Sequence, residues 1–298
     1  MSKISTQKQT YLSTYFRPSK LINWSFLLLF LIGSYYSIIW VFLKIFPDGA
    51  TYSQSVIKIM YPLGTMSVLL LNGYYFCLYY FEIPIFEKYK VNSTPWPWKE
   101  NAEHFWKYFP SAIRRYITNY VIFNVFLLLI GFYIQPSLSK ESIPSIPVYL
   151  LQILFCIFCE DFFFYWVHRM LHHPLLYSKI HKHHHEFYNV VSVACINMHW
   201  IEFIMAGILP SFSSLCILGK RMHLVTFFSF NFLRIVETHE CHSGYEFSWS
   251  MFGAIPFMNE SKYHNFHHLK NMGNYASFFR FWDSLFGTNM YYLETTDN

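Results

Sequence analysis

The sequence predicts an all-α, polytopic membrane protein with about four transmembrane helices and a helical, histidine-rich region on the cytosolic side. Of its 298 residues, 54% are hydrophobic and only 13% are charged, a composition typical of membrane proteins. Several uncharged stretches reach the roughly 20 residues that a helix needs to cross a bilayer. Fourteen of the fifteen histidines lie between His168 and His268, which makes this part of the chain distinct.

Four apolar segments are predicted to span the membrane. They cover residues 21–43, 60–81, 116–134 and 143–167. Two later apolar stretches, residues 203–218 and 224–233, are short for full spans. A hairpin, a re-entrant segment and an interfacial pair all stay open for these two stretches.

Basic residues indicate how the chain is oriented. They precede the first predicted span and fill the connection between the second and third: Lys3, Lys8, Arg17, Lys20, Lys88, Lys90, Lys99, Lys107, Arg114 and Arg115. The positive-inside rule therefore places both segments in the cytosol. Counting onward, the fourth span returns to the cytosolic side at Arg169, where the histidines begin. Lys220 and Arg221 depart from this bias if the apolar pair around them reaches the lumen.

The chain is interpreted as four parts in one membrane protein. These are a cytosolic segment (1–20), a transmembrane region (21–155), a histidine-rich domain (156–288) and a tail (289–298). The net charge of +5 is spread along the span flanks, which fits anionic lipid headgroups and not nucleic acid. The six cysteines show no disulfide spacing, and Cys156 and Cys159 are interpreted as packing residues inside a span.

The histidines form three spaced boxes. The first is the HxxxH from His168 to His172, and HxxHH boxes begin at His181 and at His264. Chance predicts roughly 0.04 copies of one HxxHH in a chain of this composition, so two copies are significant. On an α-helix, positions i, i+3 and i+4 share a face, so each box is predicted to present its imidazoles together.

This many clustered imidazoles predict a binuclear metal centre. Imidazole nitrogen binds iron, zinc, copper or nickel. A single zinc ion takes four ligands, whereas the boxes offer eight histidines, and two metals with open positions take about eight to ten. His173 and His183 lie off the ligand faces of their boxes. His104 and His223 stand alone and are interpreted as surface or core residues.

The three boxes and the residues around them resemble the fatty acid hydroxylase superfamily, and within it the sterol C-4 methyl oxidases, or methylsterol monooxygenases. FFFYWVHRMLHH, after Glu160 and Asp161, is similar to the first box of that family, and KIHKHHHEF to the second. YHNFHHLKNMGNYASFFRFWDSLFGT is similar to the third box with the C-terminal signature. ETHECHSGYEFSWS is similar to the segment with one ligand histidine before Ser-Gly-Tyr, here His242. The resemblance covers residues 156–288, and before that only the membrane architecture.

The resemblance implies a ligand set, cofactors and partners. The implied metal ligands are His168, His172, His181, His184, His185, His199, His242, His264, His267 and His268. It further implies two iron ions, O2 as the oxidant, and electrons from NAD(P)H through an external microsomal b-type cytochrome and its reductase. It places the protein in the endoplasmic reticulum membrane with the boxes facing the cytosol.

One carboxylate is expected to support the ligands from a second shell. Asp161 follows the same helical stripe as Tyr165, His168 and His172, so it is expected to orient a ligating imidazole. A carboxylate just inside an apolar span is costly without such a partner. Glu240 and Asp283 are weaker candidates for this kind of role.

Two features depart from the family pattern. His239 stands where the family usually has no histidine. It is either an incidental neighbour of His242, which is the favoured interpretation, or an altered ligand. Residues 187–198, FYNVVSVACINM, differ from the stretch that leads to the implied ligand His199. If that stretch contacts the substrate, the oxidised carbon differs from the C-4 methyl group.

The expected function is an O2-dependent oxidation of a sterol methyl or alkyl C–H bond. The resemblance favours successive hydroxylation of the C-4 methyl group to alcohol, aldehyde and carboxylate in sterol biosynthesis. Alternatives in the same class are C-24 side-chain oxidation or dealkylation, sterol desaturation and fatty-acyl hydroxylation. A divalent-metal transporter is the alternative outside this class. It predicts polar ligands within the spans and a disordered histidine loop, whereas these spans hold few ionisable groups and the boxes have helical spacing.

Overall fold

The computed structural model describes residues 18–46, 49, 51–255, 257–258 and 260–290, without the side chains of residues 18–19 and 130–132. Most of the predicted segments 1–20 and 289–298 therefore lies outside the described residues. Within the described part the chain forms helices and three isolated bridge pairs, and no strand. The predicted all-α class is confirmed.

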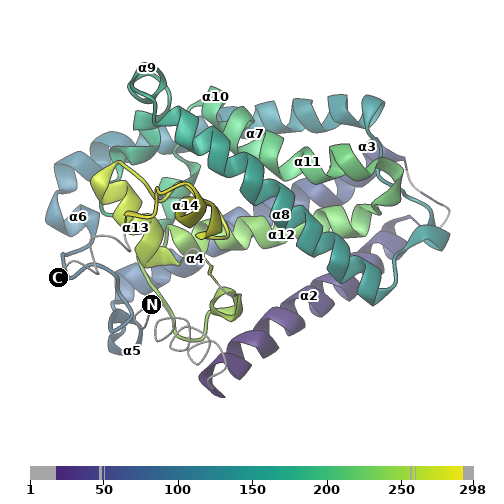
Figure 1. The fold of residues 1–298 in the computed structure, drawn as a ribbon, viewed down its shortest axis with the longest axis horizontal. Helices are drawn as coiled ribbons and strands as arrows, with labels where there is room; N and C mark the ends of the chain where they lie inside the picture. Colours follow the sequence, from purple (N-terminus) through teal and green to yellow (C-terminus); the bar gives the residue numbers. More distant parts are fainter. Residues whose placement is uncertain (1–17, 47–48, 50, 256, 259, 291–298) are drawn as a thin grey trace, which may run out of the picture.

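Long helices form the body of the protein and run between its two ends (Figure 1). They are α2 (Pro18–Ile45), α4 (Tyr61–Phe81), α7 (Ala102–Tyr133), α8 (Ile146–Leu171), α11 (Leu209–Leu218) and α12 (Leu224–Cys241). The α8 helix packs along α11, and α12 packs against α2, α4 and α8. Buried apolar side chains fill the space between them, among them Leu127, Tyr149, Phe212 and Phe228.

Short elements connect the long helices. The α-helical ones are α3 (Tyr52–Ser55), α5 (Pro84–Glu87), α6 (Pro97–Glu100), α9 (Pro174–Tyr177), α10 (Trp200–Glu202), α13 (Ser261–Lys270) and α14 (Phe281–Leu285). The π-helical ones are η1 (Val56–Met60) and η5 (Phe203–Ile208). The 3₁₀ ones are η2 (Lys140–Ser142), η3 (His181–Glu186), η4 (Ser192–Ile196), η6 (Gly219–Arg221) and η7 (Met251–Ala254).

Four helical segments of the described chain are long and apolar enough to cross a membrane. They are Lys20–Ile45, Tyr52–Phe81, Ile146–Leu171 and Trp200–Arg221. The first three match predicted spans. The fourth is a stretch that the sequence left open, and it reaches spanning length because α10, η5 and α11 follow one another without a break. The predicted span 116–134 lies in α7 except for its last residue. It is not one of the four found in the described residues, which leave out the side chains of residues 130–132.

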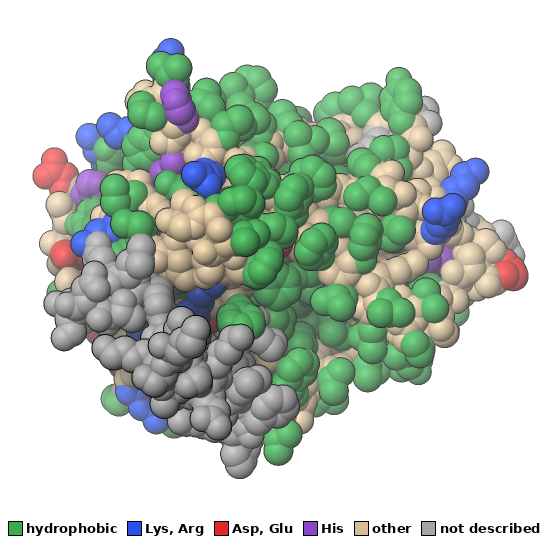
Figure 2. All heavy atoms as spheres, viewed as in Figure 1, with side chains coloured by type: hydrophobic (Ala, Val, Ile, Leu, Met, Phe, Trp, Pro, Cys, Tyr) green, Lys and Arg blue, Asp and Glu red, His purple; other side chains and the backbone are tan. Residues whose placement is uncertain are grey.

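The surface of the long helices is apolar, as a membrane protein requires. Figure 2 shows hydrophobic side chains over most of the visible face, with charged side chains gathered toward its two ends. Large hydrophobic side chains such as Leu29, Leu70, Val121 and Leu151 are exposed on α2, α4, α7 and α8. In water such a surface would be unfavourable, so these side chains are expected to contact lipid.

The connection between α7 and α8 meets the turn between α11 and α12 at one end of the molecule. The backbone N–H of Ser137 donates to the carbonyl of Met222 at 2.7 Å, and Leu224 donates back to Ser137 at 3.0 Å. In Figure 1 this end lies opposite α13 and α14. Lys220 and Arg221 in this turn therefore lie away from the histidine boxes, and their departure from the positive-inside bias stays a prediction.

This arrangement predicts opposite accessibility for two engineered cysteines. In a background with Cys77 and Cys216 replaced by serine, a cysteine at Lys220 and one at Lys99 of α6 should react with an impermeant maleimide from opposite sides of sealed vesicles. The reason is that the helices between them cross the bilayer. The parent protein without these cysteines serves as the blank, and labelling of both positions from one side would contradict the topology.

Candidate metal centre

Nine histidines converge on two adjacent groups where α8, η3, α12 and α13 meet. The first group holds His168, His172, His181, His185 and His267, and the second holds His184, His242, His264 and His268. Within each group the potential ligand nitrogens all lie within 4.8 Å of one another. Neighbouring Nε2 atoms approach closely, for example 3.2 Å between His168 and His181 and 2.9 Å between His264 and His242. Each group is therefore a compact nitrogen cage.

Each HxxHH box is divided between the two groups, which differs from the expectation that a box shares one face. In the second box the outer pair, His181 and His185, belongs to the first group, while His184 turns to the other. In the third box the outer pair, His264 and His268, belongs to the second group, and His267 joins the first. In both boxes the two histidines four residues apart share a group and the one between them faces the other group, although the second box is a 3₁₀-helix and the third lies in the α-helix α13. Each of the two HxxHH boxes thus contributes histidines to both cages.

The hydrogen bonds of the outer ring nitrogens show that the inner nitrogens carry lone pairs. His168 Nδ1 donates to the carbonyl of Tyr275 at 2.9 Å, and His267 Nδ1 donates to that of Gly273 at 2.6 Å. His242 Nδ1 donates to the carbonyl of Thr238 at 2.7 Å. A carbonyl oxygen only accepts, so Nδ1 carries the proton and Nε2 is left as an acceptor.

Such an arrangement fits metal cations. Lone pairs about 3 Å apart repel one another unless a proton or a cation lies between them. Burial lowers the pKa of His185 and of His242 to about 3, and that of His172 to about 2, so these imidazoles stay neutral at ordinary pH. Protonation is therefore not what relieves the repulsion. Neutral imidazole is the form that binds a metal, and the residues present fit a resident metal at each cage.

A carboxylate that the sequence analysis missed orients one of these imidazoles. Glu202 of α10 accepts from His181 Nδ1 through Oε1 at 2.7 Å, and both side chains are buried. Carboxylates in this position fix the ring and raise its basicity toward a metal. The signal was an acidic residue directly before the uncharged apolar stretch 203–218, where a charge without a partner is costly.

Asp161 contacts backbone and not an imidazole. Its Oδ1 accepts from the N–H groups of Ser277, Phe278 and Phe279 at 3.1, 2.7 and 3.1 Å. The expected direct contact with a ligating ring is therefore absent from the described hydrogen bonds of Asp161. Its position on α8 places it beside the C-terminal loop, and it holds this loop next to Tyr275, whose carbonyl accepts from His168.

Asp283 supports the same loop from the other side. Its two oxygens accept from the N–H groups of Tyr275 and Ala276, each at 2.8 Å. Tyr165 Oη lies 3.0 Å from Thr288 Oγ1, which in turn donates to Asp283 at 2.7 Å. The loop that orients His168 is thus held by two buried carboxylates, Asp161 and Asp283.

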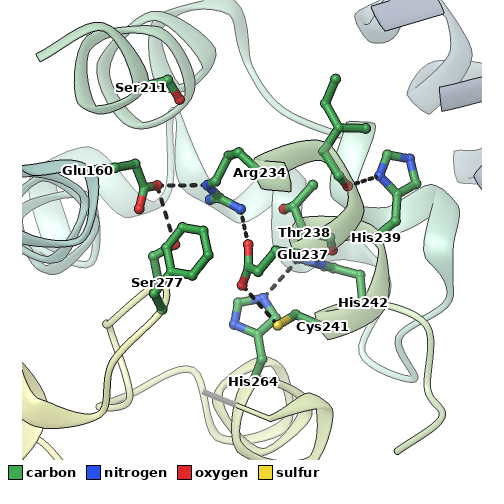
Figure 3. A network of polar contacts seen from close by, with 12 residues as sticks. Glu160, Ser211, Arg234, Glu237, Thr238, His239, Cys241, His242, His264 and Ser277 are labelled. Carbon is green, nitrogen blue, oxygen red and sulfur yellow. Dashed lines mark hydrogen bonds and ion pairs between the residues drawn. The ribbon is translucent and has the colours of Figure 1, made fainter. Parts of the chain in front are cut away.

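A second ionic network lies beside the second cage (Figure 3). Arg234 of α12 donates from Nε to Glu160 at 2.7 Å and from Nη1 to Glu237. Glu237 also accepts from the Cys241 thiol at 3.1 Å, and Cys241 directly precedes His242. In Figure 3 the side chains of Glu237 and Cys241 lie next to His264 and His242. This network ties α8, α12 and the C-terminal loop together, because Ser277 also donates to Glu160 at 3.3 Å.

The turn after His242 requires a glycine. Gly244 has φ +72°, and a Cβ there would lie 2.8 Å from the Val190 carbonyl oxygen. Tyr245, after it, is fully buried and stacks on Tyr79 with 5.9 Å between ring centroids. The Ser-Gly-Tyr sequence therefore ends α12 and directs the chain away so that His242, its C-cap, faces the second cage.

The structure does not bring His199 or His239 into either group. His199 is the N-cap of α10, and its Nδ1 accepts from the Ile201 N–H at 3.2 Å, so the ring faces the start of that helix. His239 Nδ1 donates to the Ile235 carbonyl at 2.8 Å, and its Nε2 lies 3.1 Å from the Asn72 amide nitrogen. His173 and His223 are likewise N-caps, of α9 and α12.

A long apolar cavity leads from the cages into the membrane region. At one end it is lined by His168, His181, His184, His242 and His264. Away from them its walls are mostly apolar, with Leu63, Val68, Phe123, Phe203 and Phe232 among the lining residues. The cavity passes between α4, α7, η5 and α12, and of these α4 and α7 expose large apolar side chains on the surface of the protein. A lipid molecule fits these walls, because an apolar cavity offers few partners to water.

Comparison with known proteins agrees with this geometry. Residues 153–288 match the family described as fatty acid hydroxylase. A methylsterol monooxygenase 1 of Gallus gallus is 30% identical over 221 residues, which cover 71% of this chain and 69% of that protein. The chain belongs to the fatty acid hydroxylase family. It is therefore an oxidoreductase, embedded in a membrane.

Other relatives show the range of this family. A methylsterol monooxygenase 1-1 of Arabidopsis thaliana is 34% identical over 183 residues, 57% of this chain and 60% of that protein. A very-long-chain aldehyde decarbonylase of Oryza sativa is 37% identical over 156 residues, half of each chain. No solved structure matches. The predicted boundaries at residues 156 and 288 stay a prediction.

The Glu202–His181 contact generates a test of how the first cage is positioned. Glu202→Ala should weaken metal retention roughly 10- to 100-fold, because His181 loses the partner that fixes its ring. Glu202→Gln should retain metal more strongly than Glu202→Ala and less strongly than the natural protein, since its amide oxygen still accepts a hydrogen bond. Metal retained during titration with chelators is the measurement.

Glu186→Gln is the matched control for this experiment. Glu186 pairs with Arg115 at 2.8 Å and with His183 at 2.9 Å, outside both cages. The Glu186→Gln protein should therefore keep its metal. Equal retention by Glu202→Ala and the natural protein would show that Glu202 does not support the site.

Proposed function

We propose that the two cages hold two iron ions and that the protein oxidises a methyl group of a sterol, most directly at carbon 4. The observation that supports the binuclear site is the division of nine imidazoles into neighbouring sets of five and four. The proposed ligands are His168, His172, His181, His184, His185, His242, His264, His267 and His268. His199 is left out because its ring caps α10.

Iron supplies, when bound, the reduction of O2 that is coupled to oxidation of a C–H bond: RH + O2 + 2e⁻ + 2H⁺ gives ROH + H2O. The chain contributes positioning and a dry environment. Imidazoles held by Tyr275, Gly273 and Thr238 carbonyls are fixed before the substrate arrives, so little reorganisation is needed. The apolar cavity aligns a lipid with one end beside the cages and excludes bulk water.

Two observations support a sterol. Relatives from Gallus gallus and Arabidopsis thaliana carry the name methylsterol monooxygenase. The cavity is enclosed by aromatic and aliphatic side chains that suit a rigid apolar body. Oxidation at C-4 in three rounds would give alcohol, aldehyde and carboxylate in turn. The electrons would come from NAD(P)H through an external b-type cytochrome and its reductase, at the cytosolic face of the endoplasmic reticulum.

The metal count and the ligand register can be tested together. Protein purified without oxygen should hold close to two irons per chain. His242→Ala should be iron-poor and inactive, because its Nε2 lies 2.9 Å from His264 and 3.2 Å from His184 within the second cage. Iron content and turnover are the measurements.

His239→Ala is the matched control, three residues earlier on the same helix. Its ring bonds to Ile235 and Asn72, so this variant should keep its iron and measurable activity. A stoichiometry near one in the natural protein would rule out two irons. An iron-poor His239→Ala with a normal His242→Ala would show that the assignment along α12 is wrong.

The substrate is tested by the sterol profile of cells with and without the gene. Deletion should cause a C-4 methylsterol to accumulate, since its methyl group would no longer be oxidised. Restoration by the natural protein and not by His242→Ala is the control. Accumulation of a side-chain alkyl sterol would move the oxidised carbon to C-24. Unchanged sterols with altered hydroxylated fatty acids or long-chain aldehydes would contradict a sterol substrate.

A further inference from the structure

One polar side chain in the cavity wall has an unused hydrogen-bond acceptor. Asn119 of α7 lines the cavity and is 3% exposed. Its Nδ2 donates to the carbonyl of Met198 at 2.9 Å, which fixes the orientation of the amide because a carbonyl cannot donate. Its Oδ1 is buried and has no partner among the described residues. A buried acceptor without a partner is costly, so a ligand that donates to it gains affinity.

The other cavity-lining groups of this kind are less suited to bind a ligand. Among the described residues, Glu202 Oε2, His184 Nδ1 and Asn124 Oδ1 also lack partners. Glu202 already orients His181, and His184 is part of the second cage. Asn124 is only partly buried, five residues farther along α7. Asn119 is therefore the buried acceptor that has no other role at the metals.

Asn119 lies at the metal end of the cavity. Its partner Met198 is four residues before Glu202, and Glu202 contacts His181 of the first cage. Asn124, by contrast, lies about 7.5 Å farther along the helix axis, on the side where Tyr61 Oη donates to its backbone carbonyl. An acceptor at Asn119 thus places the polar group of a bound lipid close to the carbon that is oxidised.

We infer that Asn119 Oδ1 accepts a hydrogen bond from the hydroxyl group of the substrate and so selects a C–H bond near that hydroxyl. The inference rests on the proposed function and narrows it. A sterol bound this way presents its hydroxyl-bearing ring to the cages. Oxidation near the hydroxyl follows, at a ring methyl and not at the side chain, because the apolar body then extends toward Phe123 and Phe232.

The test compares a 4-methylsterol with its analogue that lacks the 3-hydroxyl group, using the full chain with its electron-donating partners. The natural protein should prefer the hydroxylated sterol by about 10-fold or more in kcat/KM, since the analogue leaves Asn119 without a partner. Asn119→Leu should lose this preference, mostly through a higher KM, and keep its iron. Product analysis should find the new oxygen on a carbon close to the hydroxyl.

Asn124→Leu is the matched control and should keep the preference. The inference is overturned if the natural protein turns over both sterols equally, if Asn124→Leu and not Asn119→Leu loses the preference, or if the side chain is oxidised. The comparison in the natural protein decides the question even where Asn119→Leu fails to fold. No turnover of any sterol would instead contradict the proposed function itself.

Discussion

The close approach of imidazole Nε2 atoms is the constraint on which the rest of the structure depends. Lone pairs held about 3 Å apart in a dry interior repel unless cations lie among them, and burial keeps several of the rings from taking up protons. Beside the second cage, Arg234 pairs with the buried carboxylates of Glu160 and Glu237. Bound metal cations would relieve the repulsion between the lone pairs. Folding of this region and metal binding are therefore coupled.

Support for the cages extends outward in layers. Four rings are oriented through their outer nitrogens: those of His168, His242 and His267 donate to backbone carbonyls, and that of His181 donates to Glu202. Asp161 and Asp283 hold the C-terminal loop, and Arg234 joins α8 to α12. This explains why acidic residues occur inside apolar helices. Each one offsets its desolvation by fixing an element that carries a histidine or orients one.

Much of the fold and of the site could be predicted because metal binding imposes spacing on the sequence. Histidines three and four residues apart predict metal ligands, and long apolar runs predict helices that cross a bilayer. The division of each box between two cages could not be predicted, because it depends on how η3 packs against α13, which is a contact between segments far apart in the sequence. Glu202 and the true partners of Asp161 depend on contacts between distant segments. His199 fits the family pattern in sequence, yet local capping turns its ring elsewhere.

The cavity is polar beside the cages and mostly apolar elsewhere, and this affects how a lipid from the membrane can be selected. A lipid that leaves the bilayer for this cavity exchanges one apolar environment for another, so burial of its body contributes little to selection. Discrimination then depends on the few polar groups in the wall, which is where an unpaired acceptor has the largest effect. Because Asn119 and the cages are linked through Met198 and Glu202, recognition of the polar group and placement of the reacting carbon are determined by the same segment. Residues 187–198 lead directly into that segment, so we expect substitutions there to change substrate choice while the nine imidazoles stay in place.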